Sequence, residues 1–206
     1  MRLTKSRPYR MHRRAELVDQ TRQRITEAAA RLHTTIGPAN TSIAAIAEEA
    51  GVTRVTVYRH FADLDALFEA CTAHWQAENP TPDASRWPLT GDLDLRARQA
   101  LLALYAWYRD HAAELFPLFR DLTAMPRSTQ DLMRDQRGQL GDLLVQGHAQ
   151  DDDAGRQMRA VARHLVGYPT WRSLAIEQDL SDAEAAEIGV RMLTGMAASA
   201  LAPGTR

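Results

Sequence analysis

The feature that most constrains the fold of this sequence is a glycine, Gly51, placed between two short segments with helical periodicity. Over residues 43–50 the apolar side chains recur every three or four positions, which places them on one face of a helix. Gly51 is suited to end this helix, because glycine adopts left-handed backbone angles without a Cβ penalty. Thr53 can then cap the first turn of a second short helix, residues 54–60. Two short helices joined by a tight turn are typical of a helix-turn-helix.

Longer helical patterns flank this pair. Residues 13–36 carry a single apolar stripe that ends at Gly37. Asp63 can cap a further helix over residues 63–79, whose apolar face includes the only cysteine, Cys71. We therefore expect three helices packed into a small N-terminal domain, followed by a connecting helix with a buried thiol.

The remainder of the chain is also helical in pattern. Residues 79–91 contain three prolines and predict a connector at which a larger domain begins. A helix over residues 155–177 is expected to be kinked by Pro169. Ser181 and Glu184 have the spacing of a capping box at the start of the last helix. No segment favours a β-strand and no internal repeat is evident, so the predicted fold class is all-α.

Charge is distributed unevenly along the chain. Residues 1–62 hold eleven Lys and Arg against five Asp and Glu, a balance of +6, whereas residues 63–206 hold fourteen against twenty-one, a balance of −7. A basic first third indicates that a polyanion binds at one end of the molecule. Residues 1–12 lack periodicity and are predicted to form a flexible basic arm, either a solvated tail or a segment that contacts phosphates.

Composition disfavours several classes of function. No apolar run approaches the ~18–20 residues that a bilayer span needs, and the basic N-terminus lacks the apolar stretch of a secretory signal. We therefore expect a cytoplasmic protein without a membrane partner. The single cysteine cannot form an internal disulfide, and the seven histidines lack the spacing of metal ligands, so no cofactor and no metal are expected. The absence of a nucleophile–base pair and of a phosphate-binding loop in the sequence argues against an enzyme.

The second short helix carries the side chains expected to read DNA. The major groove admits one helix and presents a distinct pattern of donors and acceptors for each base pair. For any one polar residue of this segment, a solvated charge or a partly buried ring is the structural alternative. The predicted DNA-binding residues, including those that can cap the two helices, are Thr41, Ser42, Thr53, Arg54, Thr56, Tyr58, Arg59 and His60.

A longer pattern surrounds these residues. The stretch 41–67 reads TSIAAIAEEAGVTRVTVYRHFADLDAL, with the turn glycine, the capping threonine and the aromatic residues in a fixed order. It resembles the DNA-binding segment of the TetR family of bacterial regulators, and the resemblance covers about the first third of the chain. The matching residues are Thr41, Ile46, Ala47, Ala50, Gly51, Val52, Thr53, Val57, Tyr58, His60, Phe61 and Leu67.

The resemblance implies roles for single residues. Thr53 would cap the recognition helix, and Arg54 and Thr56 would lie at its base-facing start. Tyr58 and His60 match positions that usually contact phosphate or adjacent groups. The family usually has a lysine three residues after the phenylalanine, where this chain has Leu64, so one phosphate contact is expected to be missing.

The resemblance also implies a small-molecule pocket in the C-terminal domain, one per subunit. Aromatic and polarizable residues are plentiful there, and such residues line pockets between helices as well as ordinary cores. An ordinary core is therefore the competing interpretation. The predicted ligand-binding residues are Tyr105, Trp107, Tyr108, His111, Phe119, Met133, His164, Tyr168 and Trp171.

Dimerisation is a further expectation. The family usually pairs its last two long helices into a four-helix bundle, and here these helices would be residues 155–177 and 182–201. A two-fold dimer would match a palindromic operator whose half-sites lie in successive major grooves. The predicted interface residues are Ala162, Leu165, Val166, Ile188, Met192 and Ala197.

The predicted organisation has four parts: a basic arm (1–12), a three-helix helix-turn-helix DNA-binding domain (13–62), a connecting helix (63–79) and a helical ligand-binding and dimerisation domain (80–206). The predicted function is a sequence-specific, homodimeric repressor of transcription that a small-molecule effector releases from double-stranded DNA. A DNA-binding activator and a regulator whose ligand strengthens DNA binding remain open. An interaction module that does not bind DNA and an enzyme are more distant alternatives.

Overall fold

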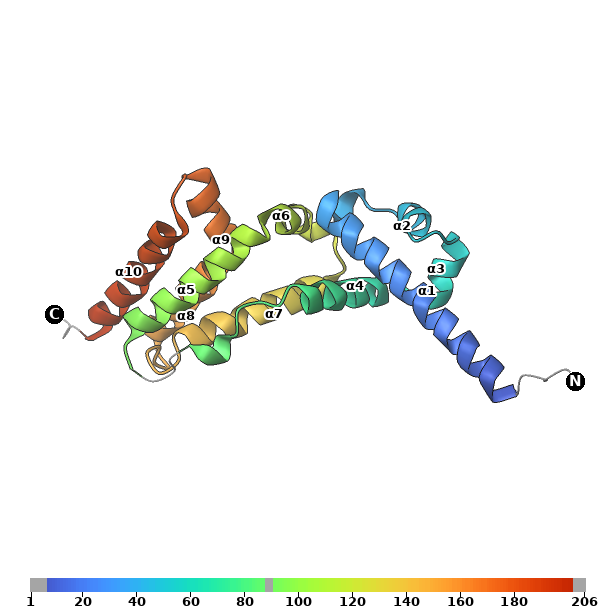
Figure 1. The fold of residues 1–206 in the computed structure, drawn as a ribbon. Coiled ribbons are helices and arrows are strands. Elements are labelled where there is room, and N and C mark those ends of the chain that lie inside the picture. Colours follow the sequence, from blue (N-terminus) through green and yellow to red (C-terminus); the bar gives the residue numbers. More distant parts are fainter. Residues whose placement is uncertain (1–6, 88–90, 202–206) are drawn as a thin grey trace, which may run out of the picture. The chain divides into compact units, whose positions relative to one another are not determined.

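The computed structural model describes residues 7–87 and 91–201 (Figure 1). Within these residues every regular element is helical and no β-strand occurs, which confirms the predicted all-α class. Short 3-10 turns follow α1, α4 and α6, and a π-helical segment follows α9. The α-helices are α1 (Arg7–Thr35), α2 (Ile43–Glu49), α3 (Arg54–His60), α4 (Leu64–Glu78), α5 (Leu93–Asp110), α6 (Ala112–Arg120), α7 (Arg127–Leu144), α8 (Asp153–Leu165), α9 (Tyr168–Trp171) and α10 (Asp182–Leu201).

The chain divides into two compact units. The N-terminal unit comprises Met1–Pro80 together with Phe116–Gln130, and the C-terminal unit comprises Thr81–Leu115 and Asp131–Arg206. The sequence prediction had placed the whole of 80–206 in one C-terminal domain. The structure instead groups the end of α6 and the start of α7 with the N-terminal unit.

Polar contacts explain why this segment joins the N-terminal unit. The Arg120 Nη2 atom donates to the Ile36 carbonyl at 2.8 Å, and the Ala39 N–H donates to Asp121 Oδ2 at 3.1 Å. Arg120 and Asp121 are themselves paired, with 2.7 Å between Nε and Oδ1. This pairing lowers the pKa of Asp121 below its usual value. The pair therefore stabilises the turn between α1 and α2, across about eighty residues of sequence that no periodicity could connect.

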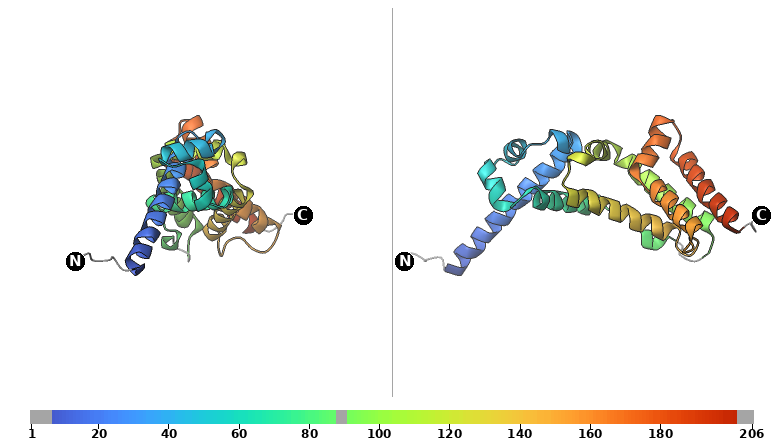
Figure 2. Two further views of the ribbon diagram at one scale, coloured as in Figure 1. Left: turned by 90° about the vertical axis from the view of Figure 1, so that its right-hand side faces the viewer. Right: turned by 180° about the vertical axis from the view of Figure 1, so that it is seen from behind.

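The core of the N-terminal unit lies between α1, the helix-turn-helix and α4. α1 packs against α4, and two further views show this pair from the side and from behind (Figure 2). The His33 ring stacks on Phe68 with 4.4 Å between ring centroids, and its Nδ1 atom lies 3.5 Å from the Cys71 sulfur. Burial lowers the pKa of His33 to about 4 and raises the pKa of the Cys71 thiol to about 12. Both groups are therefore neutral at neutral pH, and the predicted burial of Cys71 is confirmed.

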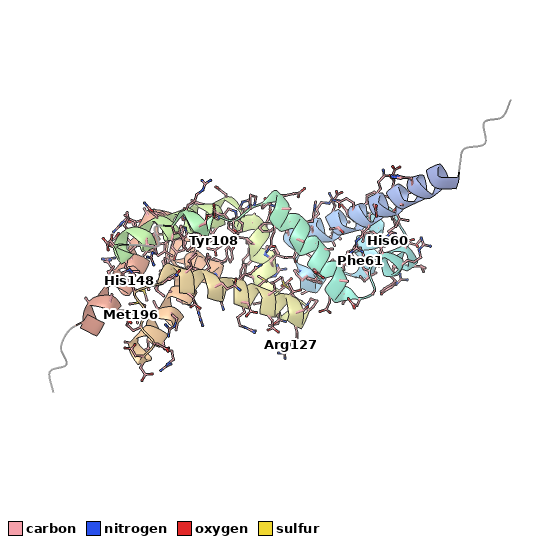
Figure 3. The ribbon with its side chains drawn as sticks, turned by 90° about the horizontal axis from the view of Figure 1, so that it is seen from below. His60, Phe61, Tyr108, Arg127, His148 and Met196 are labelled. Carbon is pink, nitrogen blue, oxygen red and sulfur yellow. The ribbon has the colours of Figure 1, made fainter. Side chains whose placement is uncertain are left out.

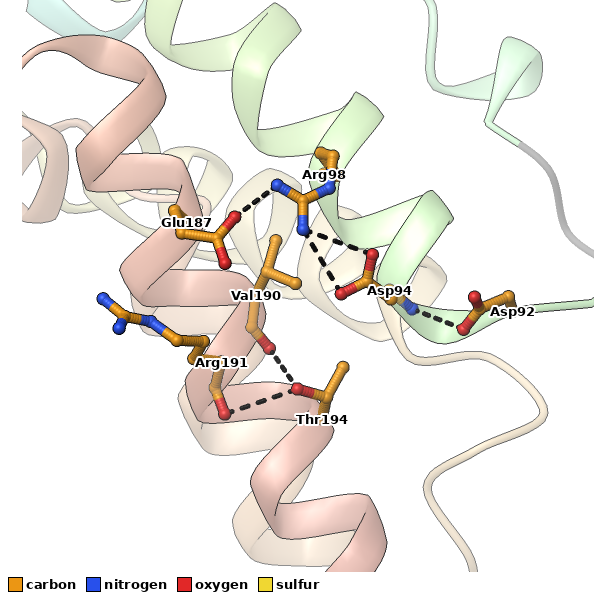
Figure 4. Close-up of polar contacts among 7 residues, drawn as sticks. All are labelled: Asp92, Asp94, Arg98, Glu187, Val190, Arg191 and Thr194. Carbon is orange, nitrogen blue, oxygen red and sulfur yellow. Dashed lines mark hydrogen bonds and ion pairs between the residues drawn. The ribbon is translucent and has the colours of Figure 1, made fainter.

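The C-terminal unit is built around α5, which packs against α10. A Cβ atom on Gly189 of α10 would come within 2.7 Å of Leu101 Cδ1, so a larger residue there would force the buried Leu101 side chain to shift. At the solvent edge of this contact Arg98 forms ion pairs with Glu187 of α10 and with Asp94, one turn earlier on α5 (Figure 4). Exposed pairs of this kind contribute little stability each, so the packing of α5 against α10 depends mainly on apolar burial.

A buried arginine of α5 bonds to the chain just beyond α7 in this unit. Arg96 of α5 is 1% exposed, and its Nη1 atom donates to the Gln146 carbonyl at 2.6 Å, just beyond the end of α7. The last carbonyls of a helix have no intrahelical partner and carry a partial negative charge, which a cation stabilises. The Arg96 side chain thus stabilises the C-terminal end of α7.

Two predicted helix boundaries differ in the structure. α1 begins at Arg7, so part of the predicted arm 1–12 is helical, and residues 1–6 lie outside the described residues. Proline is tolerated in a first helical turn, where its missing N–H would have no partner; Pro8 therefore did not delay the helix start.

The predicted kinked helix over 155–177 is instead interrupted. α8 ends at Leu165, α9 spans Tyr168–Trp171, and Arg172–Glu177 is a π-helix. Pro169 has no N–H to donate to the carbonyl of Leu165, four residues earlier. That carbonyl accepts from the Tyr105 hydroxyl at 2.9 Å instead. The interruption thus replaces a helical hydrogen bond by a tertiary one.

Candidate DNA-reading helix

The turn between α2 and α3 is built as the sequence predicts. Ser42 caps α2, with its Oγ atom accepting from the Ala45 N–H at 3.1 Å. Gly51 has a φ of 64°, in the left-handed region that favours glycine. Thr53 caps α3 and accepts from the Thr56 N–H at 3.2 Å. The Thr41 hydroxyl donates to a preceding carbonyl instead, so Ser42 is the residue that caps α2.

Helix α3 has one buried and one outward face. Val57 is 1% exposed and packs into the N-terminal core, as does Phe61 directly after the helix. Val55, Tyr58 and Arg59 have the i, i+3, i+4 spacing of one helix face, and all three are exposed. Their positions place this face away from the core.

The structure brings the predicted DNA-binding residues together on and around α3. Arg54, Tyr58 and Arg59 are exposed, and His60 is partly exposed. Figure 3 labels His60 and Phe61 where α3 ends. Burial, followed by the nearby charges of Arg59 and Arg22, lowers the pKa of His60, so its imidazole is neutral at neutral pH.

The hydroxyl residues of the predicted set are engaged within the protein. Besides its contact with the α3 backbone, the Thr53 hydroxyl lies 3.0 Å from that of Thr56. Ser42 is exposed, whereas Thr41 and Thr56 are partly buried. Their hydrogen bonds shape the two helices, and their contacts with DNA remain a prediction.

Arg22 is a residue of this site that the sequence analysis missed. It lies on α1, and its Nη1 atom donates to the His60 carbonyl at 2.5 Å. Its guanidinium lies over the Phe61 ring, with 4.1 Å from Cζ to the ring centroid. A cation at a helix C-terminus satisfies orphan carbonyls and interacts favourably with the helix dipole. Arg22 thus holds the end of α3 against α1, and nothing in the sequence indicates this contact across 38 positions.

Val55 and Leu64 are exposed apolar residues at the same site. Val55 is 72% exposed on α3, and Leu64 is 52% exposed as the first residue of α4. The sequence offered a signal for Val55: at 100° per residue it lies about 200° around the helix from the buried Val57. The Leu64 side chain is available to solvent where the TetR resemblance places a lysine.

The comparisons with known proteins agree with this geometry. Residues 25–71, from α1 to α4, match the family model described as "Bacterial regulatory proteins, tetR family". No curated protein matches the chain. These features define the chain as an all-α DNA-binding regulator with an N-terminal helix-turn-helix. Residues 25–71 are therefore identified as a DNA-binding domain of the tetR family of bacterial regulatory proteins.

Solved structures share the fold at low sequence identity. A provisionally assigned fatty acid metabolism regulator of Clostridium perfringens is 17% identical with a TM-score of 0.56, over 84% of this chain and 97% of that chain. A provisionally assigned tetR family transcription regulator of Shewanella sp. PV-4 is 22% identical with a TM-score of 0.53, over the same shares. The multidrug binding protein EbrR, complexed with imidazole, is 24% identical with a TM-score of 0.51, over 85% of this chain and 88% of that chain.

Most of the predicted ligand-binding residues lie in the C-terminal unit, where several are buried. The hydroxyls of Tyr105 and Tyr108 donate to the carbonyls of Leu165 and Val166, at 2.9 and 2.6 Å. Burial raises the pKa of both tyrosines. The rings of Tyr108, Tyr168 and Trp171 lie within 6 Å of one another between centroids. Their packing is that of a core, and their role in ligand binding stays a prediction.

The other predicted ligand-binding residues are more dispersed. Trp107 and His111 are partly buried, with 4.8 Å between their ring centroids. Met133 is partly buried on α7, and His164 is exposed on α8. Phe119 belongs to the N-terminal unit, unlike the rest of the set.

The predicted dimer residues divide by burial. Ala162, Leu165 and Val166 are at most 1% exposed within the protomer, so they already serve its own core. On α10, Ile188 and Ala197 are partly exposed and Met192 is 44% exposed. Only the α10 residues of the predicted set therefore have side-chain surface to offer a second subunit.

Other kinds of site find no support in the described residues. Across 7–87 and 91–201, no three His, Cys, Asp or Glu side chains are grouped as around a metal ion. None of the helices in these ranges combines the length and hydropathy of a bilayer span.

Proposed function

We propose that the protein is a sequence-specific transcriptional repressor that binds double-stranded DNA through α3 and is released by a small molecule. The observation that carries the proposal is the exposed surface of α3, which includes Arg54 and Arg59. Thr53 caps the start of this helix, and Arg22 bonds to its last carbonyl. Arginine can form bidentate hydrogen bonds with guanine in the major groove, and exposed cations neutralise phosphates.

Binding as a homodimer completes the proposal. Two copies of α3 related by a two-fold axis would read the half-sites of a palindromic operator about one helical turn apart. The exposed α10 surface with Ile188, Met192 and Ala197 supports a dimer contact there. We expect Met192→Glu to yield monomers in sedimentation velocity. An intact dimer would move the contact to another surface.

Release by a ligand is supported by similarity alone. The structural relative EbrR is a multidrug binding protein solved with imidazole. A ligand that prefers the state unable to bind DNA lowers DNA affinity by its differential affinity for the two states. The aromatic residues of the C-terminal unit are the candidates to contact it. A thermal-shift screen of small molecules would identify binders, because a ligand raises apparent stability by mass action.

The central test is DNA binding itself. Duplexes selected from a random library are labelled, and binding is followed by fluorescence anisotropy at fixed salt. Arg54→Ala should weaken specific binding by about 1–3 kcal/mol if Arg54 contacts a guanine. The matched control Arg86→Ala, which removes an exposed arginine of the connector, should change it little. A wild-type protein without preference for any duplex at low salt would contradict the proposal and favour an interaction module that does not bind DNA.

Activator and repressor differ in the effect of the bound protein on transcription. A reporter downstream of the selected operator separates the two, since a repressor lowers expression that the ligand then restores. A regulator whose ligand strengthens DNA binding would show higher affinity in the anisotropy assay when the ligand is added.

A further inference from the structure

We propose that Val55 is a specificity-determining residue that contacts the C5-methyl group of a thymine in the operator. The inference rests on the proposed DNA binding and deepens it. Val55 is 72% exposed, the highest value among the exposed large apolar side chains of the residues that the structure describes.

Packing within the protein does not explain this valine. Val57, two positions later on the same helix, is 1% exposed and belongs to the core cluster. Valine also has a lower helix propensity than alanine, because its β-branch restricts χ1. An exposed valine therefore adds nothing to the stability of this short helix, and its side chain is free to contact a partner.

The neighbours of Val55 indicate what that partner is. Tyr58 and Arg59 follow at the i+3 and i+4 positions of the same face, and Arg54 precedes it, and all are exposed. Cations on this face favour a polyanion. An apolar side chain between them would then meet the base edges and not the phosphates. Among the groups that base pairs present in the major groove, the methyl group of thymine is the apolar one.

The test deletes the methyl group from the DNA and the side chain from the protein. In the duplex obtained by selection, each thymine is replaced in turn by uracil, which lacks only the C5-methyl group. At one thymine per half-site, we expect wild-type affinity to fall about fourfold, the loss of one buried methyl group. Val55→Ala should bind the thymine duplex correspondingly more weakly and should not distinguish thymine from uracil at that position.

An exposed apolar residue outside the predicted DNA-binding set provides the control. Leu132→Ala shortens an apolar side chain of α7 that is 45% exposed. It should retain the thymine–uracil difference. Thermal melts of Val55→Ala should match wild type, because the side chain is exposed.

Two results would overturn the inference. One is wild-type binding that is unaffected by uracil at every position. The other is a Val55→Ala variant as sensitive to uracil as the wild type. Both are distinct from failure of the proposed function, in which the wild-type protein selects no duplex at all. Replacing cytosine by 5-methylcytosine in the same duplex shows whether Val55 also contacts the C5-methyl group of a methylated cytosine.

Discussion

The two units of this protein place the same residue types in opposite environments. Tyr58, in the N-terminal unit, is 61% exposed on the outward face of α3. Tyr105, in the C-terminal unit, is fully buried, and its hydroxyl donates to a backbone carbonyl. Arginines differ in the same way, with Arg54 in solvent and Arg96 buried at the end of α7.

This difference shows where each unit can act without rearrangement. The exposed side chains of Arg54, Tyr58 and Arg59 on α3 would need no internal bond to be broken before contacting DNA, whereas the Thr56 hydroxyl contacts Thr53. The tyrosine hydroxyls of the C-terminal unit already have internal partners, so a ligand that reaches them must displace hydrogen bonds or ring contacts. Such displacement is the kind of differential contact that couples ligand binding to a change of state.

The largest expected effect breaks the aromatic core of the C-terminal unit. Trp171 is fully buried, and its Nε1 atom donates to Asp182 at 2.8 Å. Trp171→Ala should lower the free energy of unfolding by about 3–5 kcal/mol, through lost burial and the cavity left behind. Chemical denaturation measures this loss. A change of less than about 1 kcal/mol would mean that the cluster is not a packed core, contrary to the burial of its members.

Acid should act first on the N-terminal unit. The pKa of His33 is about 4 in the folded protein, against 6.5 for an ordinary histidine, so the unfolded state binds more protons between these values. Stability from neutral His33 is thus complete above about pH 6.5 and is lost as the pH falls towards 4, by roughly 2 kcal/mol at about pH 5. Denaturation curves at several pH values test this, with His33→Phe as the variant that should lose the pH dependence. An unchanged pH profile in that variant would assign the acid sensitivity to other groups.

A pair of substitutions removes one tyrosine hydroxyl from each unit. Tyr105→Phe leaves the Leu165 carbonyl without its 2.9 Å partner and should cost about 1–3 kcal/mol of stability. Tyr58→Phe should change stability by no more than about 0.5 kcal/mol and act instead on DNA affinity. Parallel melts and anisotropy titrations test the contrast. Equal stability losses in the two variants would remove the distinction drawn between the two units.

A smaller effect is expected from the residue that holds the end of α3. Arg22→Ala should weaken specific DNA binding by on the order of 1 kcal/mol, because the C-terminus of α3 loses its charged donor. Arg22→Lys should not restore it, since an ammonium cannot both lie flat on Phe61 and donate to His60. Arg24→Ala removes an exposed charge of the same helix and is the control. Equal losses of DNA affinity in the two alanine variants would mean that Arg22 acts only through its charge.

The smallest expected effect concerns Leu64 and tests whether this position lies near the DNA backbone. Leu64→Lys places a cation where the side chain is 52% exposed. We expect a higher DNA affinity at low salt and a slope of log K against log salt steeper by about 1 per added phosphate contact. Leu64→Gln, polar but uncharged, should leave the slope unchanged. A Leu64→Lys slope equal to wild type would place residue 64 away from the DNA backbone.

Local signals were the ones that could be predicted. The caps formed by Thr53 and Asp63 and the turn at Gly51 were predicted correctly, because each depends on backbone groups within four residues. Thr41 and Ser42 were both candidates to cap α2, and the structure selects Ser42. The capping box of Ser181 with Glu184 is confirmed for the same reason. The grouping of Phe116–Gln130 with the N-terminal unit was not predicted, since it depends on side chains distant in sequence.

Periodicity and capping in the sequence were sufficient to predict the all-α class, the helix-turn-helix and the polar residues that α3 carries, because they are short-range properties of the chain. Two further features came from the folded chain alone: Arg22 bonds to the end of α3, and the Tyr105 hydroxyl donates to the Leu165 carbonyl, to which Pro169 has no N–H to donate. These features depend on contacts between segments far apart in the chain, and such contacts leave no pattern in any local stretch of sequence.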